Sequence, residues 1–142
     1  MARKKVIVYQ LVGHRFMGMN EQGDRVMIDG DQPPTGPRPM ELLLMALGAC
    51  TAYDVVDIMA KKKQPLARYR VEVEGVRAET HPKRYTHITV RHIASGPNVS
   101  EEALRRAVEL SHTKYCSVSA NLNAEITTEV VVEPWEGDAS RD

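Results

Sequence analysis

The sequence predicts a single α+β domain whose secondary-structure elements follow the order βββ-α-ββ-αα-β. Three observations support this prediction. The chain has 142 residues, which is the length of one domain. Segments rich in β-branched residues occur both before and after one long stretch of strong helix formers. Because 42% of the residues are hydrophobic, a core can form without help from a metal ion or a disulfide.

The part of the chain before the long helix predicts a meander of three short antiparallel strands. We expect these strands over residues 5–11, 15–19 and 25–28. The first, KVIVYQL, is rich in β-branched residues and is closed by the turn residue Gly13. Residues 30–39 then carry four prolines and two glycines, which fit neither a sheet ladder nor a helix interior. This proline-rich segment is therefore predicted to be a loop.

One long helix is predicted over residues 39–63. Pro39 and Glu41 suit its first turn, and the lysines at its end suit the negative end of the helix dipole. Its first half is apolar nearly all round, which is typical of a helix enclosed by other elements. One chain of this size would have difficulty covering such a helix on every side. We therefore expect a second copy to bury the remainder, in a homodimer.

The rest of the chain predicts a β-hairpin, two helical segments, a last strand and a frayed tail. Ser100 offers an N-cap for the first of these helices, and two glutamates follow it in the first turn. In order along the chain, the expected elements are strands over 69–78 and 85–93, helices over 100–111 and 115–122, a strand over 124–132, and a tail over 136–142.

The charge balance excludes some classes of partner. Nineteen Lys and Arg residues match nineteen Asp and Glu residues, so neither nucleic acid nor an acidic membrane surface is an expected partner. The apolar run over 42–56 is broken by Asp54 and is shorter than the ~20 residues of a bilayer span. The apolar stretch over 6–12 is too short for the core of a signal peptide. We expect a soluble, cytoplasmic protein.

Cys50, in the middle of the long helix, is the first candidate for chemistry. As a lone cysteine between alanines, it also fits the role of a small buried hydrophobe. Asp54 and Asp57 lie on the same helical face and disfavour a thiolate there unless a basic group pairs with them. Glu41 lies about half a turn round the helix from Cys50, and its place in the first turn already accounts for it.

Cys116, in HTKYCSVSANL, is the second candidate, and His112 precedes it by four residues. That spacing suits a metal pair or a base with its nucleophile, but we expect the helix to break near Thr113. The sequence places no further ligands for zinc, and the two cysteines form no CxxC pair. No phosphate-binding loop, GxSxG elbow or HExxH motif is present. For the other histidines we expect solvated or hydrogen-bonded rings, and these are His14, His81, His87 and His92.

Two segments together resemble the OsmC/Ohr superfamily and are most similar to its YhfA-like branch. They are GPRPMELLLMALGACTAYDVVDIM and, about 65 residues later, KYCSVSANL. The resemblance implies an intertwined homodimer in which sheets from both chains wrap two long central helices. It also implies that Cys50 is the peroxidatic cysteine and Cys116 the resolving cysteine. Such enzymes reduce organic hydroperoxides with an external thiol reductant, lipoylated proteins in the Ohr branch, and need no metal or nucleotide cofactor.

The family's active site includes a glutamate directly after the helix-opening proline and an arginine from the N-terminal part. Here Met40 occupies the glutamate position, and Glu41 is one residue later, about 100° around a helix. Arg15, in GHRFMG, is the candidate partner of the thiolate. We expect an apolar lining that favours alkyl peroxides, formed by Leu43, Leu47 and Met59.

The sequence therefore leaves two principal hypotheses. The first is a thiol-dependent peroxidase in which Cys50 attacks the peroxide and Cys116 closes a disulfide. The alternative is a non-catalytic dimer that binds a small apolar or thiol-reactive ligand near Cys50. A third hypothesis, a metal ion held by the two cysteines, has the least support because no further ligands are placed.

Overall fold

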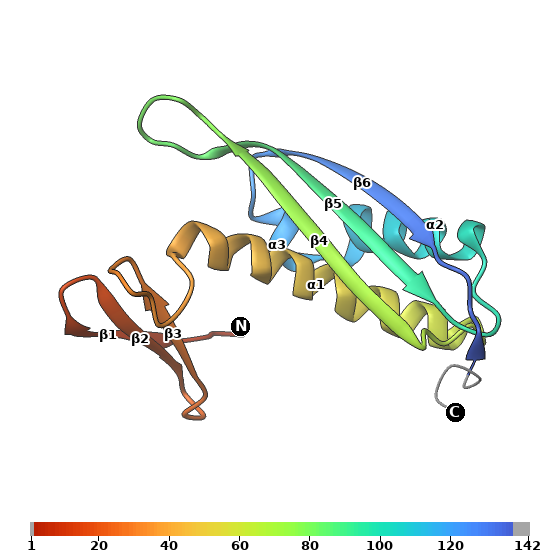
Figure 1. Cartoon of the computed structure of the whole chain (residues 1–142), viewed down its shortest axis with the longest axis horizontal. Helices are drawn as coiled ribbons and strands as arrows, with labels where there is room; N and C mark the ends of the chain where they lie inside the picture. Colours follow the sequence, from red (N-terminus) through yellow and green to blue (C-terminus); the bar gives the residue numbers. More distant parts are fainter. Residues whose placement is uncertain (1, 138–142) are drawn as a thin grey trace. The chain divides into compact units, whose positions relative to one another are not determined.

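The computed structural model describes residues 2–137, and the chain divides into two compact units, Met1–Leu43 and Leu44–Asp142. Most of the predicted tail over 136–142 lies outside the described residues. The elements occur in the predicted order, with mixed α and β structure, and they appear in Figure 1. The α+β fold class is therefore confirmed.

The first unit contains the predicted three-stranded antiparallel meander. Its strands are β1 (Val6–Val12), β2 (Arg15–Asn20) and β3 (Arg25–Asp29), in the order β1-β2-β3. Every residue of β1 is exposed, including valine, isoleucine, leucine and tyrosine side chains that ordinarily seek burial. An edge strand with both faces uncovered is therefore the least buried element of this unit.

The proline-rich loop after β3 is held by Asp29, whose side chain is 1% exposed. Its carboxylate accepts hydrogen bonds from the backbone N–H of Asp31, from the N–H and hydroxyl of Thr35, and from Nε of Arg15, at 2.7–2.9 Å. Burial raises the pKa of Asp29, but the bonds from Thr35 and Asp31 and the charge of Arg15 outweigh it and hold the pKa at about 2. The loop is thus an ordered structure built around one buried anion.

The second unit is a three-stranded sheet with helices on one face, as Figure 1 shows for α1 and α2. The strands are β4 (Arg68–Arg77), β5 (Tyr85–Ser95) and β6 (Glu125–Val132). β4 and β5 form the predicted hairpin, whereas β6 runs parallel to β5. The parallel pairing requires a crossover, and α2 (Glu101–Leu110), the π-helical turn η1 (Ser111–Tyr115) and α3 (Ser117–Ala120) supply it.

Alternation along these strands separates an apolar inner face from a charged outer face. The outer face carries ion pairs that join Arg70 and Arg91 to glutamates, among them Arg91 Nε to Glu129 at 2.8 Å. The inner face packs on the helices and forms the core, whose buried members are Val55, Met59, Ala94, Ala103, Leu104, Ala107 and Val108. The predicted N-cap is also present, since Ser100 Oγ accepts the N–H of Ala103 at 3.2 Å.

Helix α1 (Pro39–Lys61) begins at the predicted proline and ends two residues before the predicted end, where Lys63 adopts a left-handed φ of 60°. Gly48 lets α1 approach the sheet closely, because a Cβ there would lie 3.0 Å from Val73 Cγ2. One side of α1 is uncovered in the single chain, with Met45, Tyr53 and Val56 exposed. Within the second unit, the helix is therefore not enclosed on all sides.

The apolar part of α1 is longer than the run over 42–56 that the sequence predicts. The helix has 23 residues, and within residues 2–137 it alone is long and apolar enough to cross a membrane. The core helices of soluble proteins share this property, and Leu47, Val55 and Met59 of α1 are indeed buried in the second unit.

Candidate functional site

The structure brings Cys50 and Cys116 together, although 66 residues separate them in the sequence. The two thiols are free, and they lie close enough for the Cys50 thiol to raise the pKa of Cys116. Cys50 is half-buried, whereas Cys116 is buried, with 4% exposure. A pair of neighbouring free thiols, one of them partly open to solvent, is an arrangement suited to reversible disulfide chemistry.

Cys50 and Cys116 are positioned by different kinds of local structure. Cys50 lies two residues after Gly48, where α1 approaches Val73 of the sheet closely. Cys116 follows the π-helical turn η1, and its N–H donates to the carbonyl oxygen of Ser111 at 2.7 Å. This bond spans five residues, which is the π-helical pattern. The predicted break near Thr113 is therefore a widened turn that continues α2.

A chain of side-chain hydrogen bonds joins α1 to this turn. Ser111 is fully buried, and its Oγ lies 2.8 Å from Thr51 Oγ1 and 2.7 Å from Asp54 Oδ2. Thr51 is also buried, with 5% exposure. Asp54, which the sequence analysis treated only as a charge that disfavours a thiolate at Cys50, thus has a hydrogen-bonded partner. No spacing rule marks Ser111 or Thr51, so sequence reasoning missed both.

A small cavity of about 10 Å³ lies beside Cys116. Such a space holds about one water molecule, so it does not fit an alkyl peroxide or an apolar ligand. The residues that line the cavity are Leu47, Thr51, Val90, His112, Cys116, Ser119, Ile126 and Thr128. The π-helical turn thus places His112 at the same cavity as Cys116.

The environment of Cys116 favours the protonated thiol. Burial raises the pKa of Cys116, and the neighbouring Cys50 thiol raises it further, against hydrogen bonds from Ser119 that lower it. The seryl side chain also donates to the Cys116 carbonyl oxygen at 3.0 Å. Cys116 is therefore a protonated, shielded thiol rather than a solvent-facing nucleophile.

Arg15 and Glu41, the other predicted site residues, belong to the first unit, and each has partners there. Arg15 donates through Nε to Asp29 at 2.9 Å and through Nη2 to the Pro33 carbonyl at 2.9 Å. Glu41 accepts the N–H of Arg38 at 2.9 Å, as a capping residue in the first turn of α1 does. The role of Arg15 as thiolate partner and any role of Glu41 in the chemistry stay predictions.

The predicted apolar lining is wrong at Met59. Leu47 lines the cavity beside Cys116, but Met59 does not. Met59 is fully buried in the core cluster with Leu104, about two and a half helical turns beyond Cys50. Leu43 is half-buried at the end of the first unit, and its predicted role stays untested.

The structure gives most histidines hydrogen-bonded partners, as expected. His14 lies 3.1 Å from Asp31, and His87 Nε2 lies 3.0 Å from Thr127 Oγ1. His92 differs from these histidines because it is fully buried, and its ring is hydrogen-bonded to Tyr69. Within the described part of the chain, no group of three or more His, Cys, Asp and Glu side chains is placed to hold a metal ion.

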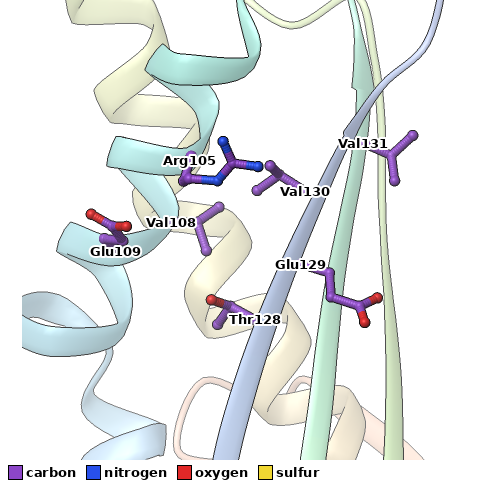
Figure 2. A pocket seen from close by; sticks show the side chains of 7 residues that line it. All are labelled: Arg105, Val108, Glu109, Thr128, Glu129, Val130 and Val131. Atoms are coloured by element: carbon purple, nitrogen blue, oxygen red, sulfur yellow. The ribbon is translucent and has the colours of Figure 1, made fainter.

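A groove of about 460 Å³ runs along the outer edge of β6, beside α2. Four consecutive strand residues, 128–131, line it, and neighbouring strand residues point to opposite faces, so the groove follows the strand edge. Figure 2 shows Arg105 and Val108 of α2 opposite Val130 of β6. Because β6 pairs only with β5 in this sheet, its other edge is open to a further strand.

Known proteins resemble this chain in both sequence and structure. Protein YhfA of Escherichia coli K12 is 38% identical over 114 residues, which cover 80% of this chain and 85% of YhfA. A crystal structure of a hypothetical protein from Aquifex aeolicus has a TM-score of 0.80 at 36% identity and covers 94% of this chain and all of that chain. The organic hydroperoxide resistance protein OhrB of Bacillus subtilis has a TM-score of 0.61 at 15% identity, covering 93% and 98%, which shows a shared fold.

The family comparison matches the part of the chain that contains both cysteines. The match is to the OsmC-like protein family, and it covers residues 30–131. It includes α1 and the crossover through η1, so the cysteine pair described above lies within the residues that match the family. The chain belongs to the OsmC-like protein family.

Proposed function

We propose that the protein is a thiol-dependent peroxidase that reduces organic hydroperoxides, with Cys50 as the peroxidatic and Cys116 as the resolving cysteine. The observation that carries this proposal is the proximity of the two free thiols, which is close enough for Cys50 to raise the pKa of Cys116. Membership of a family whose structural relatives include organic hydroperoxide resistance proteins supports the choice of substrate class.

The proposed cycle begins at Cys50. Its thiolate attacks the terminal oxygen of the hydroperoxide, so that an S–O bond forms and the O–O bond breaks. The alkoxide takes up a proton and leaves as an alcohol, and Cys50 becomes a sulfenic acid. The Cys116 sulfur then attacks the Cys50 sulfur, the S–O bond breaks, and hydroxide leaves as water with the Cys116 proton. The product is a disulfide between the two residues.

The assignment of the two roles follows from exposure. Cys50 is half-buried and so can meet a substrate, whereas Cys116 is enclosed and held as a thiol by burial. A protonated, enclosed thiol is protected from peroxide until a sulfenic acid forms beside it. An external dithiol, such as a lipoyl group, would complete the cycle by returning two electrons to the disulfide. No metal or nucleotide has a part in these steps, and the reducing environment that the cycle requires suits the cytoplasm.

We also propose that the working molecule is a homodimer. In the single chain, β1 is exposed on both faces, α1 exposes Met45, Tyr53 and Val56, and β6 has an open edge. Exposed apolar surfaces of this extent are typical of protein interfaces. A second copy would cover them without recourse to nucleic acid or a membrane as partner.

A stoichiometric peroxide titration tests the proposed activity. Reduced protein is mixed with one equivalent of cumene hydroperoxide, the thiols are trapped with an alkylating reagent, and intact and digested masses are measured. We expect consumption of the peroxide and a Cys50–Cys116 disulfide, with a loss of two hydrogens from the chain. Persistence of both thiols with the peroxide unconsumed would refute the proposal and favour the non-catalytic alternative.

A further inference from the structure

Ser111 connects the two cysteine-bearing segments through both its backbone and its side chain. Its carbonyl oxygen accepts the N–H of Cys116 at 2.7 Å. Its hydroxyl is bonded to Thr51 and Asp54, which follow Cys50 on α1 by one and four residues. A single fully buried residue therefore links the backbone of Cys116 to the helix that carries Cys50.

The direction of the hydrogen bonds in this cluster is determined by its chemistry. The one hydroxyl proton of Ser111 is donated to Asp54 Oδ2 at 2.7 Å, where the carboxylate oxygen accepts it. The Ser111 oxygen is then left to accept the proton of Thr51 Oγ1 at 2.8 Å. Hydrogen bonds to charged groups are stronger than those between neutral groups, which makes the bond to Asp54 the principal anchor.

Two pairs of residues join α1 to the turn. On each of the two segments, the residues of these pairs lie about one helical turn apart. On α1, Asp54 follows Cys50 by four residues, or about one helical turn, so both face the same way. On the other segment, Ser111 and Cys116 mark the two ends of the π-helical turn. The first pair, Asp54 and Ser111, is joined by a hydrogen bond, and the thiols of the second pair, Cys50 and Cys116, lie close together.

We propose that Ser111 is a positioning residue for the cysteine pair, which it holds in register for disulfide formation by anchoring the π-helical turn to Asp54 and Thr51 of α1. This inference rests on the proposed two-cysteine cycle. An anchored turn raises the effective concentration of the Cys116 thiol beside Cys50. Because Cys116 then has fewer conformations before the S–S bond forms, disulfide formation costs less conformational entropy. The hydroxyl of Ser111 has no contact with the reacting sulfurs in this scheme and acts only through the turn.

The test measures the equilibrium between the dithiol and disulfide forms in buffers of reduced and oxidised dithiothreitol. Thiols are quenched with acid, alkylated and counted by mass. For Ser111→Ala we expect the equilibrium constant for disulfide formation to fall about tenfold, the scale of one hydrogen bond to a charged group. A tenfold change raises the reduction potential of the pair by about 30 mV.

Thr51 provides a matched pair of variants. Thr51→Ser keeps the hydroxyl that donates to Ser111, and we expect it to retain the parent potential. Thr51→Val keeps the shape and loses the hydroxyl, and we expect a few-fold loss in the same direction as Ser111→Ala. Tyr69→Phe removes a hydrogen bond of the second unit that does not involve the cysteine segments, and it should lower the unfolding temperature without a change in the potential.

The outcomes separate this inference from the proposed function. An unchanged or more negative potential in Ser111→Ala would overturn the positioning role, even if the parent protein reduces cumene hydroperoxide. Absence of any Cys50–Cys116 disulfide in the parent at full oxidation would overturn it as well. If the potential shifts as expected while the parent leaves cumene hydroperoxide unconsumed, the positioning role stands and the peroxidase proposal fails.

Discussion

Tyr69 and His92 form a stacked, hydrogen-bonded pair between β4 and β5. The tyrosine oxygen lies 2.7 Å from His92 Nδ1, and the ring planes are inclined by 15° with centroids 6.0 Å apart. His92 is fully buried, and its Nε2 has no hydrogen-bond partner within the described residues. Protonation would place an N–H with a positive charge at that buried, unpartnered nitrogen.

The first prediction is that acid destabilises the protein through His92. Burial lowers the pKa of His92 from 6.5 to about 4, so between these pH values the unfolded chain binds a proton that the folded chain does not. The free energy of unfolding should therefore fall by about 3 kcal/mol as the pH drops from 6.5 to 4, and this contribution should level off below 4. Urea unfolding at a series of pH values measures it.

His92→Phe is the control for this prediction, because phenylalanine fills a similar volume and does not titrate. The variant should lose most of the slope in stability between pH 6.5 and 4, whatever its stability at pH 8. A parent and a variant with parallel pH profiles would show that other groups cause the acid response.

The second prediction concerns the partner of His92. Tyr69→Phe leaves Nδ1 of a buried histidine without its hydrogen bond and should lower the free energy of unfolding by about 1–3 kcal/mol. Tyr53 is 77% exposed, so Tyr53→Phe makes the same change in composition without a buried partner. Chemical denaturation should show a shift for the first variant, and an equal shift for both would contradict the prediction.

The elements of this fold were predictable because their signals are local. The helix start at Pro39, the N-cap at Ser100 and the strand at residues 125–132 follow from propensity, capping and alternation within short windows. The proximity of Cys50 to Cys116 was not local, and it came from family resemblance rather than from spacing.

What could not be predicted depends on packing between distant segments. The roles of Ser111 and of His92 arise only when a helix or a strand places a polar side chain opposite a particular partner. The prediction that Met59 lines the site was wrong for a related reason. Met59 is an apolar residue on the correct helix, but it lies too far along that helix to reach the site. Whether a polar side chain is buried, and whether a helix residue reaches a site, depend on the folded structure and cannot be read from a short sequence motif.

The third prediction is that Asp29 organises the proline-rich loop. In Asp29→Asn, one carboxylate oxygen becomes an amide that faces donors, so part of the set of bonds from Arg15, Asp31 and Thr35 is lost. The amide protons of Asp31 and Thr35 should exchange faster with solvent, as measured by hydrogen exchange.

The same carboxylate also predicts a response to strong acid. Because the pKa of Asp29 is lowered from 3.8 to about 2, its stabilising effect should be present above pH 3.8 and be lost as the pH falls through 2.

Asp31 and Thr35 amides that exchange at the parent rate in Asp29→Asn would show that the loop is held by other contacts.

The fourth prediction separates the roles of the two cysteines. Cys50→Ser should abolish reduction of cumene hydroperoxide, because serine at neutral pH offers no comparable nucleophile. Cys116→Ser should reduce about one equivalent of peroxide per chain and then stop with a sulfenic acid at Cys50, which dimedone traps as an adduct of known mass. Equal turnover with excess dithiothreitol in both variants and the parent would contradict these roles.

The last prediction tests the homodimer through β1. Val8 is 57% exposed in the single chain, and edge strands tolerate lysine well, so Val8→Lys should leave the folded monomer intact. If a second copy covers this strand, the same charge is forced into an apolar interface and the dimer should dissociate. Light scattering after size exclusion measures the mass of each species. Asn98→Lys, which adds the same charge in an exposed loop before α2, serves as the control and should match the parent. A monomeric parent, or a Val8→Lys variant that stays dimeric, would show that β1 is not part of such an interface.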